Sequence, residues 1–60
     1  MSKLRAVLIQ HAKTGNWMVF TVEEDLIHGV TLQACCFTYN QAYDLCDNNE
    51  WRIIVSIERN

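Results

Sequence analysis

Two runs of mostly aliphatic residues stand near the start of the chain, each long enough for a β-strand. The first is Leu4 to His11 (LRAVLIQH) and the second is Trp17 to Val22 (WMVFTV). The short polar loop between them contains Gly15, which adopts a positive φ at little cost. Two such runs joined by a glycine-containing loop predict a β-hairpin.

A polar interval from Glu23 to Gly29 precedes a third run, in which Val30, Leu32 and Ala34 alternate with polar neighbours. This alternation predicts a strand whose apolar residues share one face. A short helix that begins at Thr21 is the alternative for the interval. Thr21 and Glu24 fit a capping box, and Gly29 is a suitable helix end.

The next segment has the features of a helix from Tyr39 to about Asp47. Thr38 is a favourable N-cap, and Gln41 completes a capping box three residues later. Asn48 or Asn49 is expected to close the helix in the left-handed conformation. One face of this helix carries apolar residues at spacings of three and four: Tyr39, Ala42, Leu45 and Cys46.

The last run, Trp51 to Glu58, alternates and predicts a strand with one buried face. The residues expected on the buried face are Trp51, Ile53, Val55 and Ile57, and those expected opposite are Arg52, Ile54, Ser56 and Glu58. The whole chain, residues 1–60, is therefore expected to be one α+β domain. Its elements follow the order β-β-β-α-β, as an antiparallel four-stranded sheet with one helix packed on one face.

A helix of about nine residues is roughly 14 Å long and 10 Å wide, which is too narrow to shelter a sheet of four strands on both sides. Yet both hairpin strands carry apolar residues on both of their faces. The second face is therefore expected to be an interface with another copy of the chain or with a different protein. The alternative is that loops and the Glu23 to Gly29 segment fold over it.

The residues expected to contact the partner are apolar side chains of this second face together with a neighbouring acidic turn. An acidic turn beside an apolar face speeds the encounter with a basic cleft and sets its register. These candidate partner-binding residues are Val7, Ile9, Phe20, Glu23, Glu24, Asp25 and Ile54.

The charge balance argues against a nucleic-acid binder that acts as a monomer. Five Lys and Arg residues are outnumbered by seven Asp and Glu residues, which gives a formal net charge of −2. Phosphate neutralisation supplies most nonspecific nucleic-acid affinity. The alternative is a dimeric nucleic-acid-binding module, in which duplication gathers Lys3, Arg5, Arg52 and Arg59 into one stripe.

Neither a cofactor nor a catalytic site is expected. The three cysteines, Cys35, Cys36 and Cys46, form no CxxC pair, and an odd number leaves one unpaired in any intramolecular scheme. They are interpreted as reduced apolar residues of a cytoplasmic protein. A zinc site that combines His28 with Cys46 and one of the vicinal cysteines lacks the short paired spacings of zinc motifs.

No serine, aspartate or cysteine stands at a spacing typical of a catalytic triad, so an enzyme is not expected. The two glycines form no phosphate-binding motif. No apolar run approaches the ~20 residues of a membrane span, and no signal-peptide pattern begins the chain, so membrane insertion is not expected.

Three short strings resemble the HicB-type antitoxin fold. They are Gly15 to Val19 at the turn into the second strand, Asp25 to Thr31, and Thr38 to Ala42 at the start of the helix. The half from Thr38 to Glu58 is also similar to small inhibitors made by phages, including the RNA polymerase inhibitor of T7-like phages. Both resemblances imply a small protein that works by docking on another protein.

The sequence therefore leads to the hypothesis of a non-enzymatic protein-binding module that inhibits or sequesters a target. A phage or another mobile element is the expected source, with a role in host takeover, anti-defence or antitoxin action. A homodimer is the expected assembly, because the apolar surplus is available to a second copy.

Overall fold

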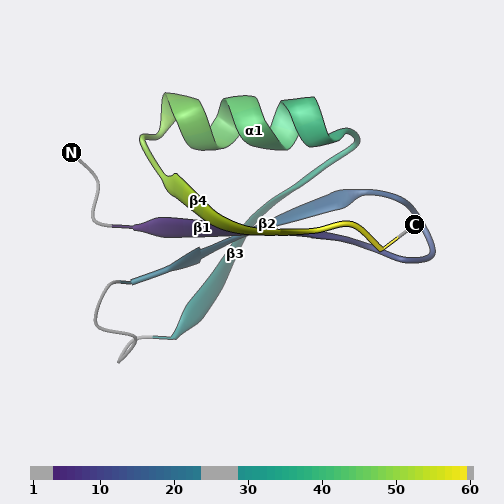
Figure 1. The fold of residues 1–60 in the computed structure, drawn as a ribbon, viewed down its shortest axis with the longest axis horizontal. Helices are drawn as coiled ribbons and strands as arrows, with labels where there is room; N and C mark the ends of the chain where they lie inside the picture. Colours follow the sequence, from purple (N-terminus) through teal and green to yellow (C-terminus); the bar gives the residue numbers. More distant parts are fainter. Residues whose placement is uncertain (1–3, 24–28, 60) are drawn as a thin grey trace.

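The computed structural model describes residues 4–23 and 29–59, which form four strands and one helix (Figure 1). The elements are β1 (Arg5–Gln10), β2 (Trp17–Val22), β3 (Val30–Cys36), α1 (Tyr39–Asn48) and β4 (Arg52–Ile57). The α+β class and the order β-β-β-α-β are thus confirmed. A helix that begins at Thr21 is wrong, because Thr21 and Val22 belong to β2, and residues 24–28 lie outside the described residues.

The β1–β2 hairpin forms as predicted and occupies the centre of the sheet. Gly15 has a φ of 77°, the left-handed conformation that the turn requires. The loop is closed by two backbone hydrogen bonds, from the His11 N–H to the Asn16 carbonyl at 2.7 Å and from the Gly15 N–H to the His11 carbonyl at 2.9 Å.

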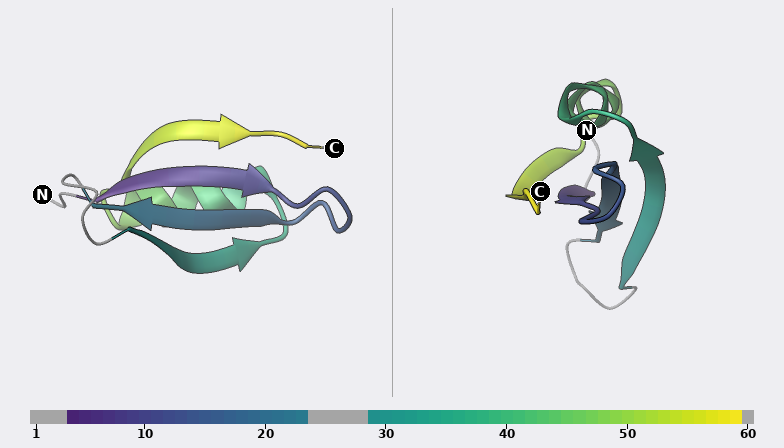
Figure 2. Two further views of the ribbon diagram at one scale, coloured as in Figure 1. Left: turned by 90° about the horizontal axis from the view of Figure 1, so that it is seen from below. Right: turned by 90° about the vertical axis from the view of Figure 1, so that its right-hand side faces the viewer.

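The sheet is mixed, so the prediction of a fully antiparallel sheet is wrong. The strand order is β3-β2-β1-β4, and β4 pairs parallel with β1. β1 and β3 both run antiparallel to β2 and therefore share a direction. Because α1 carries the chain back along the sheet after β3, β4 starts at the same end as β3 and runs with β1 (Figure 2). Alternation of residue types predicts strands, but it holds no information on which strand pairs with which.

The predicted capping residue starts the helix. The Thr38 Oγ1 accepts from the Gln41 N–H at 3.2 Å, and the Gln41 Oε1 accepts from the Phe37 N–H at 2.9 Å. At the other end the left-handed residue is Glu50, with a φ of 58°, rather than Asn48 or Asn49. The Trp51 N–H donates to the Cys46 carbonyl at 2.9 Å and the Glu50 N–H to the Asp47 carbonyl at 3.1 Å, which is a Schellman motif.

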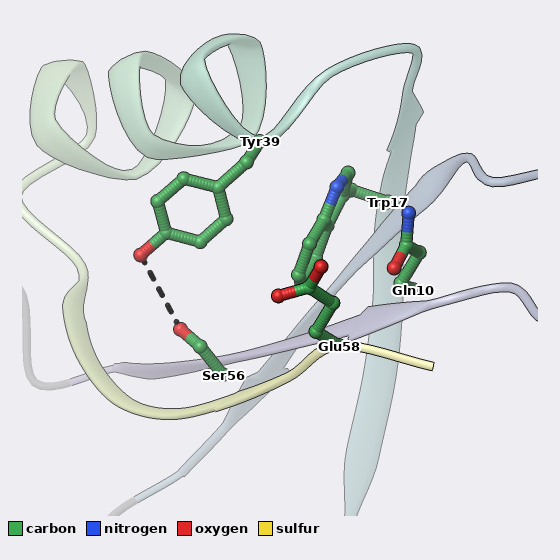
Figure 3. Close-up of a pocket in the computed structure, with 5 residues that line it drawn as sticks. All are labelled: Gln10, Trp17, Tyr39, Ser56 and Glu58. Atoms are coloured by element: carbon green, nitrogen blue, oxygen red, sulfur yellow. Dashed lines mark hydrogen bonds between the residues drawn. The ribbon is translucent and has the colours of Figure 1, made fainter. Parts of the chain in front are cut away.

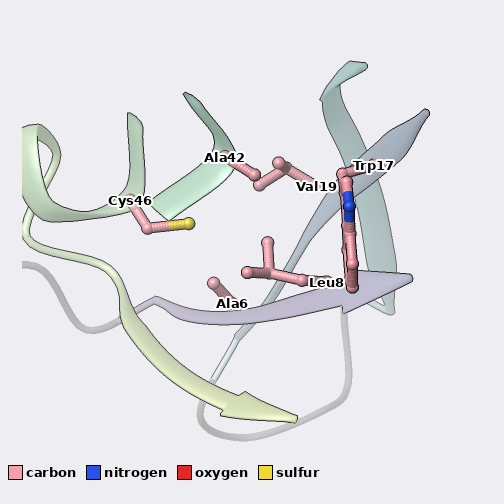
Figure 4. Packing of buried hydrophobic residues seen from close by; sticks show 6 residues of the cluster. All are labelled: Ala6, Leu8, Trp17, Val19, Ala42 and Cys46. Carbon is pink, nitrogen blue, oxygen red and sulfur yellow. The ribbon is translucent and has the colours of Figure 1, made fainter. Parts of the chain in front are cut away.

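The core lies between α1 and the two central strands (Figure 4). Two small helix residues, Ala42 and Cys46, are fully buried and let the helix backbone approach the sheet closely. The buried cluster consists of Ala6, Leu8, Trp17, Val19, Ala42 and Cys46. Leu45, Trp51 and Ile53 pack against it as predicted.

A β-bulge in β4 overturns the predicted faces of that strand. Ile53 pairs with Ala6 and Val55 pairs with Val7, so Ile54 is an extra residue without a partner in β1. One extra residue reverses the alternation that follows it. Val55 therefore lies with Val7 on the side away from the helix, and so does Ile57.

Ser56, expected on the outer side, instead lies on the helix side of β4. Its partner in β1 is the buried Leu8, and its Oγ lies 3.4 Å from the Tyr39 hydroxyl of α1.

β3 has a second bulge with the same effect. Ala34 pairs with the buried Val19, whereas Leu32 pairs with Phe20, which leaves Gln33 as the extra residue. The Gln33 side chain donates to the buried Thr21 hydroxyl at 2.9 Å. The prediction that Val30, Leu32 and Ala34 share one face is therefore wrong, and only Ala34 faces the helix.

The bulge in β4 predicts that two isoleucines of one apparent stripe differ in their effect on stability. We expect Ile53→Ala to lower the free energy of unfolding by about 1–2 kcal/mol, because Ile53 packs against the core, and Ile57→Ala by less than ~0.5 kcal/mol. Urea denaturation followed by tryptophan fluorescence measures both values. Equal losses for the two variants contradict the bulge.

Candidate functional site

The sheet face away from α1 is apolar across all four strands, and we call it the open face. Register places these residues together, since Val7 pairs with Phe20 and Ile9 with Met18, each between residues that face the helix. Within residues 4–23 and 29–59 no helix or strand covers this face (Figures 1 and 2). The apolar side chains of the open face are Val7, Ile9, Met18, Phe20, Val22, Val30, Leu32, Val55 and Ile57.

The open face is most exposed along its two edge strands. Leu32 of β3 is 52% exposed, and Val55 and Ile57 of β4 are each 41% exposed. Val7, Ile9 and Phe20 of the central strands are half-buried by their neighbours. The most accessible apolar residues of the face are thus those that the bulges turn outward.

Basic residues stand at both ends of the open face. At one end Arg5 and Arg52 are direct partners in neighbouring strands, and both are exposed. At the other end Lys13 and Arg59 line a cavity of about 360 Å³ together with Ile9 and Met18 of the face, and with Gln10, His11 and Ala12. The surface is therefore an apolar centre with basic residues at both ends, and the acidic Glu23 follows Val22, the partner of Arg5, at the first end.

The structure brings together only some of the predicted partner-binding residues. Val7, Ile9 and Phe20 lie on the open face. Ile54 is 46% exposed on the bulge at the edge of β4, and Glu23 is exposed just beyond β2. Glu24 and Asp25 lie outside the described residues.

Sequence reasoning missed Leu32, Val55 and Ile57 as open-face residues. The pattern of the last strand assigned Val55 and Ile57 to its buried face, and that of the third strand only grouped Leu32 with Val30 and Ala34. For the last strand the local signal is the presence of two apolar neighbours, Ile53 and Ile54, in a run that was expected to alternate. Such a pair marks a position where an extra residue is tolerated, but it does not show that a bulge forms.

The cysteines lie in three different environments. Cys35 is exposed and pairs with Met18 of the open face, whereas Cys36 is half-buried and pairs with Trp17 on the helix side. Cys46 is buried, and its pKa is raised first by burial and second by the neighbouring Cys36 thiol. The vicinal Cys35 and Cys36 therefore point to opposite faces of the sheet.

The structure offers no support for a metal centre in the part of the chain that it describes. No group of three His, Cys, Asp or Glu side chains there lies close enough to hold an ion. His28, the histidine of the possible zinc site, lies outside the described residues. No helix among the described residues is long and apolar enough to cross a membrane.

Comparisons with protein-family models, with curated proteins and with solved structures find no significant match for this chain. The resemblance to HicB-type antitoxins and to phage inhibitors therefore stays a prediction.

Cysteine reactivity tests these environments directly. We expect iodoacetamide to modify Cys35 first and Cys46 last, because the thiolate reacts and burial both shields Cys46 and raises its pKa. Mass spectrometry of proteolytic peptides after brief labelling gives the order, and labelling in denaturant is the control in which the differences disappear.

The same raised pKa makes stability depend on pH. The unfolded thiol ionises near pH 8.5 while folded Cys46 keeps its proton, so the folded state binds more protons and stability falls as pH rises above about 8.5. Cys46→Ala removes this part of the pH dependence. Rapid labelling of Cys46 at neutral pH in the folded protein contradicts its assigned position.

Proposed function

We propose that this chain is a non-enzymatic protein-binding module that inhibits or sequesters a target protein through its open face. The observation that supports this is the continuity of apolar side chains over all four strands of an uncovered sheet face. Full burial of one such side chain contributes about 1.5–3 kcal/mol of free energy, and a side chain that stays in water does not gain it. A few such residues together match the whole stability of a small domain.

The size of the open face fits a docking site that extends beyond the strands. Four strands at about 4.8 Å spacing and six residues at about 3.3 Å rise give a footprint of roughly 400 Å². A standard interface buries ~800 Å² on each partner. The partner is therefore expected to reach the residues at the ends of the face, which are basic.

These basic ends specify the chemistry of the partner. A protein with an apolar centre and carboxylates on either side complements Arg5 and Arg52 at one end and Lys13 and Arg59 at the other. A homodimer is the alternative occupant. Stacking two open faces brings cationic ends together in either orientation, which opposes self-association.

Glu23, Glu24 and Asp25 are proposed as a separate contact to a basic part of the same target. A phage or other mobile element as the source, action inside the cytoplasm, and a host-takeover, anti-defence or antitoxin role belong to the same proposal, and they follow from the resemblances given above.

Matched surface variants test the open face. We expect Leu32→Asn and Ile57→Asn each to weaken target capture from a lysate of the encoding organism by at least about tenfold, while Phe37→Asn leaves it unchanged. Phe37 is 80% exposed but precedes α1 outside the sheet, so it controls for the loss of any exposed apolar side chain. Cross-linking followed by mass spectrometry locates the contact on the chain.

Sedimentation of the same variants distinguishes the two occupants. A monomer that retains one stoichiometric protein supports the proposed heterologous partner, whereas a wild-type dimer that Leu32→Asn dissociates identifies a second copy as the occupant. Equal capture by all four proteins contradicts docking through the open face.

A dimeric nucleic-acid-binding module is the second candidate, and one observation favours it. Arg5 and Arg52 lie side by side in the sheet, so two phosphate contacts from one end of the face are feasible. For such a binder, affinity for duplex DNA or RNA falls steeply with salt, and Arg52→Gln lowers the slope of log K against log salt by about one. We expect no such slope, and Asp44→Asn serves as the charge control.

A further inference from the structure

Two cavities lie between α1 and β4, on the opposite side of the molecule from the open face. The first has a volume of about 390 Å³ and is lined by Gln10, Trp17, Tyr39, Ser56 and Glu58 (Figure 3). The second has a volume of about 250 Å³ and is lined by Tyr43, Asp47, Trp51 and Ile53. Each cavity therefore combines a tryptophan, a tyrosine and a carboxylate.

The first cavity has fixed aromatic walls. The rings of Trp17 and Tyr39 meet edge to face, with centroids 4.9 Å apart and an angle of 72° between their planes. The Tyr39 hydroxyl lies 3.4 Å from the Ser56 hydroxyl of β4, which ties the ring to the strand. Because Trp17 also belongs to the core, its ring forms a fixed wall of the cavity.

The backbone next to the carboxylate residue of this cavity, Glu58, is fixed by hydrogen bonds. The Arg59 N–H donates to the Gln10 Oε1 at 3.2 Å, and the Gln10 Nε2 donates to the Gly15 carbonyl at 3.1 Å. These bonds fasten the chain beyond β4 to the hairpin, and the Glu58 side chain lies beside Trp17 (Figure 3). No described residue donates a hydrogen bond to the Glu58 carboxylate.

Aromatic rings and a carboxylate that no described residue binds match a cationic side chain. A cation near the ring face of tryptophan or tyrosine is attracted by the ring quadrupole, and a carboxylate adds a charge-assisted hydrogen bond. Arginine fits this set best, since its planar guanidinium stacks on rings and donates to a carboxylate together.

The second cavity repeats this chemistry one helical turn away. Tyr43 follows Tyr39 by four residues, with ring centroids 6.4 Å apart, and Asp47 follows Tyr43 by four more. Trp51 and Ile53 form the opposite wall. The two cavities thus form one row along α1 and β4.

β4 also offers a backbone edge beside this row. It ends the strand order β3-β2-β1-β4, so its outer edge pairs with no described strand. Its sequence RIIVSI contains no proline and only one charge, and its bulge at Ile54 lies near the start of the strand, so the edge from Val55 to Ile57 stays regular and open to strand addition. An extended peptide added here directs alternate side chains to the helix side.

We propose that the row between α1 and β4 binds an extended basic segment of another protein. The segment pairs with the outer edge of β4 and inserts an arginine between Glu58 and the Trp17–Tyr39 rings. Ile53 lines one cavity and Glu58 lines the other. Because the bulge between them takes up one residue, the two are separated by about four strand positions, or about 13 Å. A second basic residue four positions from the first therefore reaches the cavity of Trp51 and Asp47.

The probe is an acetylated and amidated heptapeptide with arginine at its second and sixth positions and with threonine and valine elsewhere. Each tryptophan lies in one cavity, so the two indole N–H signals in a nitrogen-15 spectrum of the full chain report on the cavities separately. We expect both signals to shift and to saturate. Replacing both arginines by citrulline, which keeps the shape but removes the charge, is expected to weaken binding by about tenfold.

Two variants that remove one negative charge each separate the site from general electrostatic attraction. We expect Glu58→Gln to weaken peptide binding by about fivefold to tenfold, and Asp44→Asn, an exposed α1 residue outside both cavities, to change it by less than about twofold. Glu58 is exposed and lies after β4, so we expect the substitution to leave the fold intact. The nitrogen-15 spectrum of the variant checks this.

Three results contradict the proposed site. An unchanged Trp17 signal at saturating peptide, equal binding of the citrulline peptide, or equal losses for the two charge variants overturns the site. A shift of Trp17 without Trp51 overturns the two-cavity register.

Discussion

Close packing of one ten-residue helix on the centre of a four-stranded sheet is the contact on which the rest of the structure depends. Ala42 and Cys46 present small side chains to the sheet, so that the helix lies directly on Leu8 and Val19. Such a short helix covers the middle of one face only. The other face, the outer edges and the borders of the helix are left to be satisfied by solvent or by a partner.

The two bulges decide how the apolar side chains are divided between the faces. If Ile54 were paired in a regular strand, Val55 and Ile57 would lie under the helix with Ile53, where α1 is too narrow to cover them. With the bulge, Ser56 reaches the Tyr39 hydroxyl, and the apolar side chains move to the open face. The bulge at Gln33 does the same for Leu32 in β3. The edge strands β3 and β4 thus extend the apolar open face of the hairpin over the full width of the sheet.

The two candidate surfaces differ in charge as well as in position. The open face is apolar with arginine and lysine at its ends, whereas the row between α1 and β4 combines aromatic rings with Glu58 and Asp47. A protein of small net charge can in this way present opposite charges to two partners, or to two parts of one target. Charge complementarity then sets orientation and encounter rate, while the apolar and aromatic contacts supply most of the affinity.

The sequence by itself determined the helix and the strands, because a hairpin glycine, a helix cap and an alternating run are local signals. Gly15 lies in the hairpin turn and Thr38 caps the helix, as their residue types predict. It also predicted an uncovered apolar face, since Val7, Ile9 and Phe20 exceed what one helix shelters. Only the tertiary structure decided that β4 runs parallel beside β1, and that Ile54 and Gln33 bulge. Pairing and register are set by long-range contacts between strands, which a local alternation of apolar and polar residues does not encode.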